Sequence, residues 1–289
     1  MSFTVAIVLH NSAPQLSALL SSIDEHLVDR PQVICVDSGS TDDGASLAAT
    51  WGAEVVVMEG NPGYGAANNA ALPLASHEVT VMLNPDVVLL DGGLARLAAA
   101  AAGRRALIAP RLLNDDRSIQ DSAHPIPGGR DGYLAAVTVP RLLPARLRNH
   151  LEPFRAVEEV EVGWAIGACL AAQTALLREL GPFNSDDFLF AEDLELCLRA
   201  RAIAVPTVFD PSVTLVHSGA HTSSGGLDQQ RCDLQASRRR AVIAAQLGAG
   251  ALARDDRSQA LTFALRAAVR RDFAYNKMLL SALRRARRS

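Results

Sequence analysis

Short apolar segments rich in β-branched residues alternate with helical segments along the first third of the chain, and this alternation restricts the fold more than any other feature. Each apolar segment has the length of a strand, and each segment between two of them is typical of a surface helix. In chain order, beginning with a strand, the segments are 4–10, 14–25, 32–37, 41–51, 53–59, 65–75 and 79–83. Strands and helices at this spacing form right-handed βαβ units, so we expect an α/β fold with a mainly parallel sheet.

The regularity fades after a further helix near 93–102. Residues 114–153 are rich in Pro, Gly, Asp and Arg, which predicts a hairpin or long loops over the crevice. A second apolar region, 162–180, leads to a last strand at 207–210 or slightly longer, and the sequence beyond Asp228 is helical in pattern. We therefore expect two parts, residues 1–226 and a C-terminal helical region, residues 227–289.

The composition of the chain predicts where in the cell the protein is found. No segment approaches the roughly 18 uninterrupted apolar residues of a membrane span, and the strand-like start leaves no room for a signal peptide. We expect a cytoplasmic protein. The four cysteines are widely spaced and form no CxxC pair, which predicts reduced thiols and no zinc site.

Charge is divided unevenly along the chain. Residues 254–289 hold ten Arg or Lys against three Asp, so the net charge of −3 conceals about −10 on the remainder. This asymmetry indicates that the tail meets an anionic surface. Nucleic acid is a poor candidate for that surface, because the body is acidic and aromatic residues make up only 4% of the chain.

The strand at 79–83 runs directly into Asn84-Pro85-Asp86. Proline cannot donate to a sheet ladder, so the strand should end at Asn84. In open α/β sheets the carboxyl ends of strands face the ligand crevice, and a carboxylate there can hold a metal ion or a ligand hydroxyl. The alternative is a strand-to-helix turn in which Asp86 is a cap.

A second polar turn, Asp37-Ser-Gly-Ser-Thr-Asp-Asp-Gly, follows the strand at 32–37. As pure structure it is a helix N-terminus, with Ser40 or Thr41 accepting hydrogen bonds from first-turn amides. As a ligand site it would let Asp37 accept a hydrogen bond from a nucleobase while the turn faces a ribose.

The third strand and the next helix are joined by Asn61-Pro-Gly-Tyr-Gly-Ala-Ala-Asn-Asn. Glycines let the backbone pass close to a ligand, and the helix start offers unpaired amides to a phosphate. The pattern Gly63-x-Gly65-x-x-Asn68 also suggests a dinucleotide fingerprint. That interpretation is weakened because Asn68 replaces the third glycine and the motif follows the third strand rather than the first.

Two further groups carry ionisable side chains. Glu192 and Asp193 are adjacent, so on a helix they point about 100° apart, and one of them could face the crevice as a general base. Their structural interpretation is a charged first helical turn stabilised by the helix dipole. His217 and His221 follow the last strand, where His217 could approach Asp86 and contact a metal ion or a diphosphate.

Taken together, these motifs resemble the inverting family 2 glycosyltransferases of GT-A fold, in particular their rhamnosyltransferase-like branch. The resemblance covers roughly residues 3–224. It is carried by VDSGSTDDG at 36–44, NPGYGAANNA at 61–70, LNPDV at 83–87, GWAIGACLA at 163–171, GPFNSDDFLFAEDLELCLRAR at 181–201 and the histidines at 217 and 221. It implies a GT-A fold, a Rossmann-like and mainly parallel sheet flanked by helices, with a C-terminal helical extension.

The resemblance also implies roles for individual residues. Asp37 would contact the nucleobase, Asp86 and His217 would hold Mg²⁺ or Mn²⁺ against the diphosphate, and the Glu192-Asp193 pair would supply the catalytic base, by analogy Asp193. Trp164 and Gly167 would bind the acceptor. The residues predicted to bind the donor are His10, Asn11, Asp37, Ser38, Asn61, Gly63, Tyr64, Gly65, Asn68, Asn84 and Asp86.

The implied reaction moves a sugar, with L-rhamnose as the candidate, from a dTDP- or UDP-sugar to a glycan or a polyprenyl-linked glycolipid in cell wall biosynthesis. A single displacement with inversion needs one base and no carboxylate nucleophile. Gly181-Pro-Phe-Asn-Ser and Gln173 depart from the family pattern and leave the acceptor open. The alternatives are a nucleotide-sugar-binding module without catalysis and an NAD(P)-dependent oxidoreductase.

The tail has the pattern of a basic amphipathic helix. Its apolar residues recur at helical spacing and are flanked by basic ones, so it could lie on an anionic membrane surface. A helix packed on the body and a homodimer contact are the alternatives. The apolar residues are Leu261, Leu265, Val269, Phe273, Leu280 and Leu283, and the basic ones are Arg266, Arg270, Arg271, Lys277, Arg284, Arg285, Arg287 and Arg288.

Overall fold

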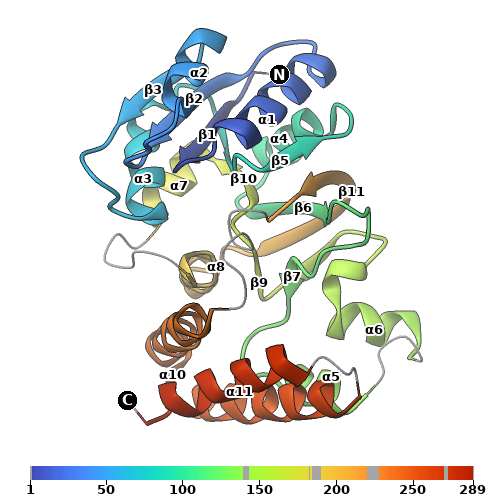
Figure 1. Cartoon of the computed structure of the whole chain (residues 1–289). Helices are drawn as coiled ribbons and strands as arrows, with labels where there is room; N and C mark the ends of the chain where they lie inside the picture. Colours follow the sequence, from blue (N-terminus) through green and yellow to red (C-terminus); the bar gives the residue numbers. More distant parts are fainter. Residues whose placement is uncertain are drawn as a thin grey trace.

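One large sheet organises the upper part of the molecule (Figure 1). The computed structural model describes residues 2–138, 143–181, 183, 190–219, 228–269 and 273–288. Within these residues the sheet has nine strands in the order β3-β2-β1-β4-β10-β6-β11-β5, with β8 paired to β11. The strands are β1 (Thr4–Leu9), β2 (Gln32–Asp37), β3 (Glu54–Val57), β4 (Val79–Leu83), β5 (Val87–Leu89), β6 (Leu107–Leu113), β8 (Val160–Val162), β10 (Cys169–Gln173) and β11 (Thr207–His217).

Strands β3, β2, β1 and β4 are parallel, as the alternating pattern predicts, so their carboxyl ends meet at one edge. Strand β10 is antiparallel to both β4 and β6, which makes the sheet mixed rather than wholly parallel. Asn84-Pro85-Asp86 joins β4 to the short strand β5, not to a helix. Strand β11 extends past the predicted Asp210 to His217, with a shift of register between Asp210 and Thr214 around Pro211, which cannot donate to the ladder.

Helices cover both faces of the sheet. On one face α1 (Ala13–His26), α2 (Gly44–Trp51) and α4 (Gly93–Ala102) enclose the largest hydrophobic cluster. On the other lie α3 (Tyr64–Ala71), continued by the 3₁₀ turn η1 (Leu72–Leu74), with α7 (Thr174–Leu180) and α8 (Glu192–Ala202). In α1, Leu16, Leu19 and Ile23 are fully buried at helical spacing, so an amphipathic stripe docks this helix.

Residues 114–156 differ from the predicted hairpin or loops. Leu113 and Ile119 close a small hairpin, but the segment then forms β7 (Ala123–His124), α5 (Arg130–Val137), α6 (Ala145–Leu151) and the 3₁₀ turn η3 (Pro153–Arg155). Strand β7 pairs with β9 (Trp164–Ala165) in a separate two-stranded sheet below the main one (Figure 1). The local preference of this segment for loops is outweighed by its packing against residues that are distant in the chain.

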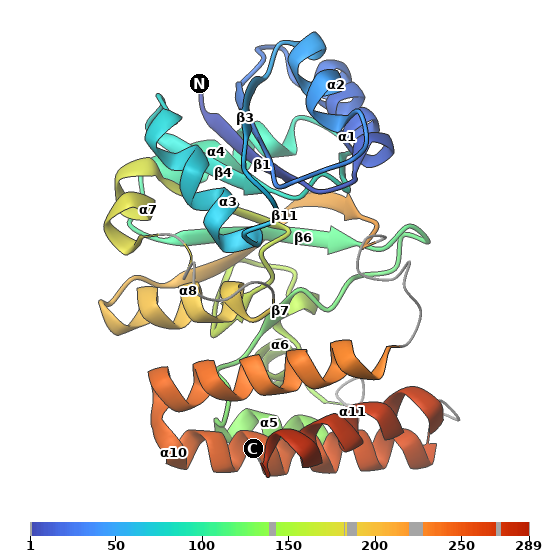
Figure 2. The ribbon, with the colours of Figure 1, turned by 60° about the vertical axis from the view of Figure 1, so that its left-hand side comes forward.

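The C-terminal region is helical, as predicted, over the described residues. Helix α10 (Gln229–Val269) contains a non-helical residue, Gly248, with φ 81° and ψ 169°, and its two arms, 229–247 and 249–269, run back along each other in Figure 2. We call these the first and second arms. Arg239 and Arg240 on the first arm pair with Asp255 and Asp256 on the second, each at 2.9–3.0 Å.

Helix α11 (Phe273–Ala286) packs against α10, with Ala282 and Leu283 buried (Figure 1). The predicted boundary at 226/227 lies outside the described residues, as do His221, Arg270 and Arg271, so that boundary stays a prediction. Over the part of the chain that the structure describes, no helix has both the length and the apolarity required to cross a membrane. The four cysteines are free and buried in the structure.

Candidate functional site

A cavity of about 620 Å³ opens at the carboxyl edge of β1, β2 and β4. It is also bordered by the loop between β9 and β10, the start of α8, the end of β11 and the start of α10. Predicted site residues that line it are His10, Ser38, Asn61, Gly63, Tyr64, Asn84, Asp86, Gly167, Glu192, Asp193 and His217. Segments separated by more than 200 residues thus line one cavity, as expected at an edge where parallel strands end together.

Hydrogen bonds connect the loops at one end of this cavity. The Nδ1 atom of His10 lies 2.8 Å from the carbonyl oxygen of Ser38. The Ser38 hydroxyl donates to Oδ1 of Asn61 at 2.9 Å, and the same oxygen accepts the Gly63 amide at 3.1 Å. Gly63 has φ 97°, a conformation that favours glycine, and it brings the backbone to the start of α3. These loops are therefore held in place before any ligand binds.

Tyr64 connects three segments in the middle of the cavity. Its hydroxyl lies 2.9 Å from Oδ1 of Asn84 and 3.0 Å from the carbonyl oxygen of Gly167. Burial, followed by the nearby charge of Glu192, raises the pKa of Tyr64 well above its usual range, so the phenol stays protonated and acts as a donor. Asn84 thus has its side-chain oxygen engaged within the protein.

Asp193 lies in the first turn of α8 and is half-buried against the cavity. Its Oδ2 accepts the Gly167 amide at 3.0 Å, and its Oδ1 accepts the Leu194 amide at 2.7 Å. These bonds favour the carboxylate, but burial is the larger effect and raises the pKa of Asp193 above its ordinary value. A carboxyl group with a raised pKa that faces a cavity is suited to accept a proton.

The backbone before Asp193 is strained. Phe190 and Ala191 have φ of 73° and 65°, a left-handed conformation that non-glycine residues rarely adopt. Such strain persists only where the surrounding structure enforces it, and it is concentrated at ligand sites. Glu192 lines the same cavity beside Asp193.

Asp86 and His217 face each other across the cavity floor. Oδ1 of Asp86 lies 3.4 Å from Nε2 of His217, and both residues are buried. Gln120 orients the histidine, because its Oε1 lies 2.8 Å from Nδ1 of His217 while its Nε2 donates to Oδ1 of Asn114. This hydrogen bond is consistent with a proton on Nδ1, and Nε2 is the ring nitrogen that faces Asp86.

This pair has the donor chemistry of a divalent cation site. In the tautomer that Gln120 selects, a carboxylate oxygen and an imidazole nitrogen are both acceptors at short range, and a cation would satisfy both. Among the residues that the structure describes, no group of three or more His, Cys, Asp or Glu side chains could hold a metal ion. Asp86 and His217 therefore fit an ion that takes its other ligands from substrate oxygens and water.

Four residues predicted to bind the donor do not line the cavity. Asp37 is buried and its Oδ1 accepts the Ser40 amide at 3.3 Å, and Oδ1 of Asn11 accepts the Thr41 amide at 2.8 Å. Gly65 lies within α3, and Asn68 donates to the carbonyl oxygen of Tyr64 at 3.0 Å. In this structure Asp37 and Asn11 stabilise the turn after β2, and Gly65 and Asn68 belong to α3.

Trp164 lines a second cavity instead of the first, although Gly167, three residues later, lines the first. Sequence reasoning missed Gln120, Arg231 and Gln235. The latter two extend from the first arm of α10 into the first cavity. They belong to no local motif, and only the packing of α10 beside α8 brings them there.

Comparison with known proteins bears on the family and the fold. Residues 4–140 match the profile of Glycosyl transferase family 2. The chain is 27% identical over 240 residues to an N-acetylglucosaminyl-diphospho-decaprenol L-rhamnosyltransferase of Mycobacterium tuberculosis, covering 76% of each chain. It is also 24% identical over 203 residues to a low-salt glycan biosynthesis hexosyltransferase of Haloferax volcanii, covering 68% of this chain and 61% of the relative.

Among solved structures, a mannosyltransferase from Pyrobaculum calidifontis in complex with GDP-Man and Mn²⁺ superposes with a TM-score of 0.62 at 18% identity. The match covers 98% of this chain and 85% of that one. The family profile includes the loops at 37–44 and 61–69 and the Asn84-Pro85-Asp86 turn, and the structural match extends the same fold over the remainder. Residues 4–140 therefore form a Glycosyl transferase family 2 domain, and the chain as a whole has the GT-A fold.

Proposed function

We propose that this glycosyltransferase moves a hexose, with L-rhamnose as the candidate, from a nucleoside diphosphate sugar to a polyprenyl-linked glycan acceptor. The observation that carries the proposal is the joint placement of Asp193, Asp86 and His217 in the lining of one cavity. The mycobacterial relative supports rhamnose and a lipid-linked acceptor by its name, and the archaeal mannosyltransferase supports a nucleotide-sugar donor.

In this proposal the donor lies along the loops that end β1, β2 and β4. The amide of Asn61 and the backbone at Gly63 face the nucleotide, and the diphosphate lies toward Asp86 and His217. These two residues would hold Mg²⁺ or Mn²⁺, which when bound neutralises charge on the departing diphosphate. Gln120 keeps His217 in the required tautomer.

Asp193 is the proposed base. Its carboxylate takes the proton of the acceptor hydroxyl as that oxygen forms a bond to the anomeric carbon, and the bond from that carbon to the diphosphate oxygen breaks with its electron pair. One displacement inverts the anomeric centre. The amides of Gly167 and Leu194 fix the orientation of the carboxylate for this transfer.

The test combines donor binding with turnover. A thermal-shift screen with UDP-, dTDP- and GDP-sugars, each with and without Mn²⁺, should give one donor whose stabilisation requires the metal. With that donor, Asp193→Asn should reduce turnover by about 10²–10⁴-fold, the usual contribution of a general base, and leave the thermal shift intact.

Asp29→Asn, at an exposed loop position, is the matched control for loss of one carboxylate. Glu192→Gln identifies which acid of the pair is the base, since a larger loss there than in Asp193→Asn would transfer the role to Glu192. Near-normal turnover in Asp193→Asn would refute the assignment. Donor binding without any transfer would favour a module that only binds nucleotide sugars.

We further propose that the protein works at the inner membrane surface as a peripheral protein. Exposed basic side chains on α10, on α11 and in the turn after α11 support this proposal, among them Arg266, Lys277, Arg284 and Arg288. Together they can attract an anionic leaflet, each contributing about 1 kcal/mol near the surface.

A further inference from the structure

A second cavity of about 710 Å³ lies below the first, between the small β7–β9 sheet, α5, η3 and the second arm of α10. The proposed donor, base and metal residues lie in the first cavity. The second is larger and is bounded mainly by segments outside the strand–helix repeat. A cavity of this size can hold a substantial organic group.

Its mouth is apolar and exposed. Val137 on α5 and Leu265 on the second arm line the cavity, and their exposed fractions are 62% and 38%. Leu134 and Leu147, at 42% and 40%, add exposed aliphatic side chains on α5 and on α6, which packs against α5. Apolar groups gathered at the opening of a cavity indicate a ligand or surface that is itself apolar.

The walls between the mouth and the interior are also largely apolar. They include Ile126, Ala135, Ala136, Leu151 and Phe154, with Phe263 from the second arm. Arg266, also exposed, lies among the lining residues and its charge acts on Asp121. The lining also holds the carboxylates Asp121, Glu152 and Asp255, of which Asp255 is paired with Arg239. Apolar walls with the guanidinium of Arg266 among them match an amphiphile that carries an anionic group.

The inner end is polar and borders the first cavity. Trp164 stacks on the imidazole of His124 with ring centroids 4.2 Å apart, and the Arg239 guanidinium lies 5.8 Å from the Trp164 ring. Burial and then the charge of Arg239 lower the pKa of His124 to about 3, so the imidazole is neutral and can exchange hydrogen bonds with uncharged hydroxyls.

Two features connect this end to the proposed reaction centre. Trp164 precedes Gly167, whose amide binds the proposed base, by three residues. Arg231 and Gln235 line the first cavity and Arg239 lines the second, so positions i, i+4 and i+8 of one helix face both cavities. At a rise of 1.5 Å per residue the two sites are about 6–12 Å apart along α10.

From this arrangement we infer that the second cavity holds the lipid part of the acceptor, an isoprenoid chain joined through a diphosphate to the sugar that is extended. The sugar points past Trp164 toward Gly167, and the chain leaves between Val137 and Leu265. This inference rests on the proposed function for its direction, because the acceptor hydroxyl must reach Asp193.

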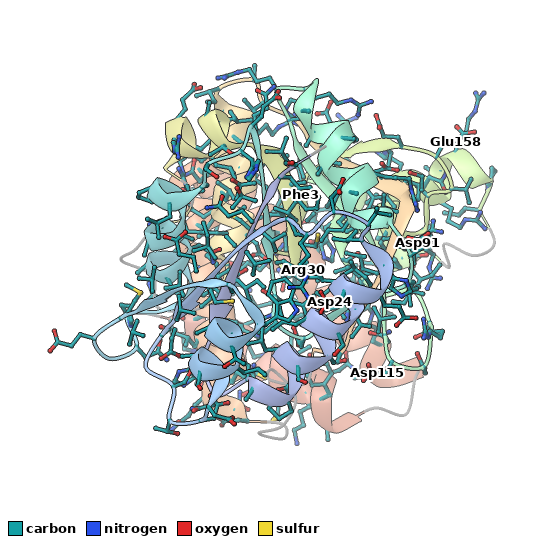
Figure 3. All side chains as sticks on the ribbon, turned by 90° about the horizontal axis from the view of Figure 1, so that it is seen from above. Phe3, Asp24, Arg30, Asp91, Asp115 and Glu158 are labelled. Carbon is teal, nitrogen blue, oxygen red and sulfur yellow. The ribbon has the colours of Figure 1, made fainter. Side chains whose placement is uncertain are left out.

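The chain contains two tryptophans, which provides a direct binding signal. Trp51 lies on α2, where its Nε1 donates to Asp24 at 2.9 Å and Arg30 lies 4.6 Å over its ring. Figure 3 shows Asp24 and Arg30 side by side on that part of the sheet domain. The Trp51→Phe variant therefore leaves Trp164 as the single reporter, at the inner end of the second cavity.

Farnesyl diphosphate is the probe, and no nucleotide sugar is needed. It should change the emission of Trp51→Phe saturably, whereas inorganic diphosphate at the same concentration should not. Adding Ala135→Phe to Trp51→Phe places a larger side chain in the cavity and should weaken farnesyl diphosphate binding about tenfold or more. Adding Ala264→Phe, an exposed position on the second arm that does not line the cavity, should leave binding unchanged.

Thermal unfolding of each variant shows whether it is folded. Ala135→Phe is also made as a single variant, with Trp51 retained, and assayed for sugar transfer. Its KM should rise for a farnesyl-diphosphate-linked sugar and stay constant for the same sugar on a methyl diphosphate. The inference would be overturned if Trp51→Phe gave no saturable response. It would also be overturned if Ala135→Phe and Ala264→Phe, each added to Trp51→Phe, gave equal responses. Farnesyl diphosphate binding without any sugar transfer would instead leave the lipid site standing and reject the proposed function.

Discussion

At the scale of single residues, the carboxyl group of Asp193 is subject to opposing influences. Two backbone amides and a helix N-terminus favour its ionised form, while burial opposes it, and burial is the larger effect. A base must be ionised to accept a proton but must also hold that proton well, so a raised pKa serves the reaction at neutral pH.

The pH dependence of turnover should reveal this balance. The acid limb of kcat/KM should lie above pH 3.8, the ordinary value for aspartate, because transfer requires the ionised form. Folding of the wild type should lose stability as the pH rises through the raised pKa, since the folded state favours the protonated carboxyl. Asp193→Asn should lack that loss in thermal melts. An acid limb at or below 3.8 would contradict the burial argument.

Gln120 offers a second test at this scale. Gln120 contacts His217 and does not line the donor cavity. Gln120→Leu should therefore leave the donor-site side chains in place but remove the hydrogen bond that holds the proton on Nδ1 of His217. Outer partners of metal ligands commonly account for 10–100-fold in affinity. We expect a rise of about that size in the Mn²⁺ concentration for half-maximal activity, measured against Gln246→Leu on α10 as the control. An unchanged Mn²⁺ requirement would mean that Gln120 has no part in metal binding.

At the scale of elements, the reversal in α10 depends on one glycine. Gly248 has a φ/ψ combination that is nearly restricted to glycine, and it lets the two arms fold back so that two Arg–Asp pairs form between them. The first arm then contributes Arg231 and Gln235 to one cavity and Arg239 to the other. A local backbone feature thereby determines how the C-terminal region meets the sheet domain.

Two glycine substitutions should have opposite effects. Gly248→Ala meets no steric clash, yet it should lower the free energy of unfolding by about 1–3 kcal/mol through backbone strain. Gly250→Ala, two residues later in the second arm, has no positive φ and only an ordinary contact with Arg254, so it should raise stability by about 0.5 kcal/mol. Denaturant unfolding measures both. Equal effects would show that the reversal does not depend on Gly248.

At the scale of the whole molecule, the tail is not an extended amphipathic helix with one apolar face. Leu283 is buried on α11 while Leu265 on the second arm is 38% exposed, and α11 packs along α10. The second arm of α10 packs on α5 and α11 packs on α10, which agrees with the alternative of a packed helix, and membrane binding stays a proposal. Removing residues 255–289 would expose this interface, so charge reversal is the better test of membrane binding.

Reversing three exposed cations leaves the helix packing intact. The triple variant Lys277→Glu, Arg284→Glu and Arg288→Glu should weaken binding to anionic vesicles by about 3 kcal/mol or more, roughly 100-fold, because each basic residue contributes about 1 kcal/mol near such a surface. Co-sedimentation with phosphatidylserine vesicles measures the loss. A matched triple reversal on the sheet domain, at Arg30, Arg104 and Arg105, should have little effect. Equal vesicle binding by the wild type and both triple variants would exclude the basic surface of the C-terminal helices as the membrane contact.

The sequence by itself determined the parallel strands and the edge at which Asn84 and Asp86 lie. It could do so because strand and helix periods are local, and because parallel strands must end on the same side. Only the tertiary structure decided that Asp37 and Asn11 brace turns outside the cavity, that Gln120 orients His217, and that a second cavity lies beside Trp164. Those outcomes depend on contacts between segments roughly 30 to 130 residues apart, which no local pattern encodes.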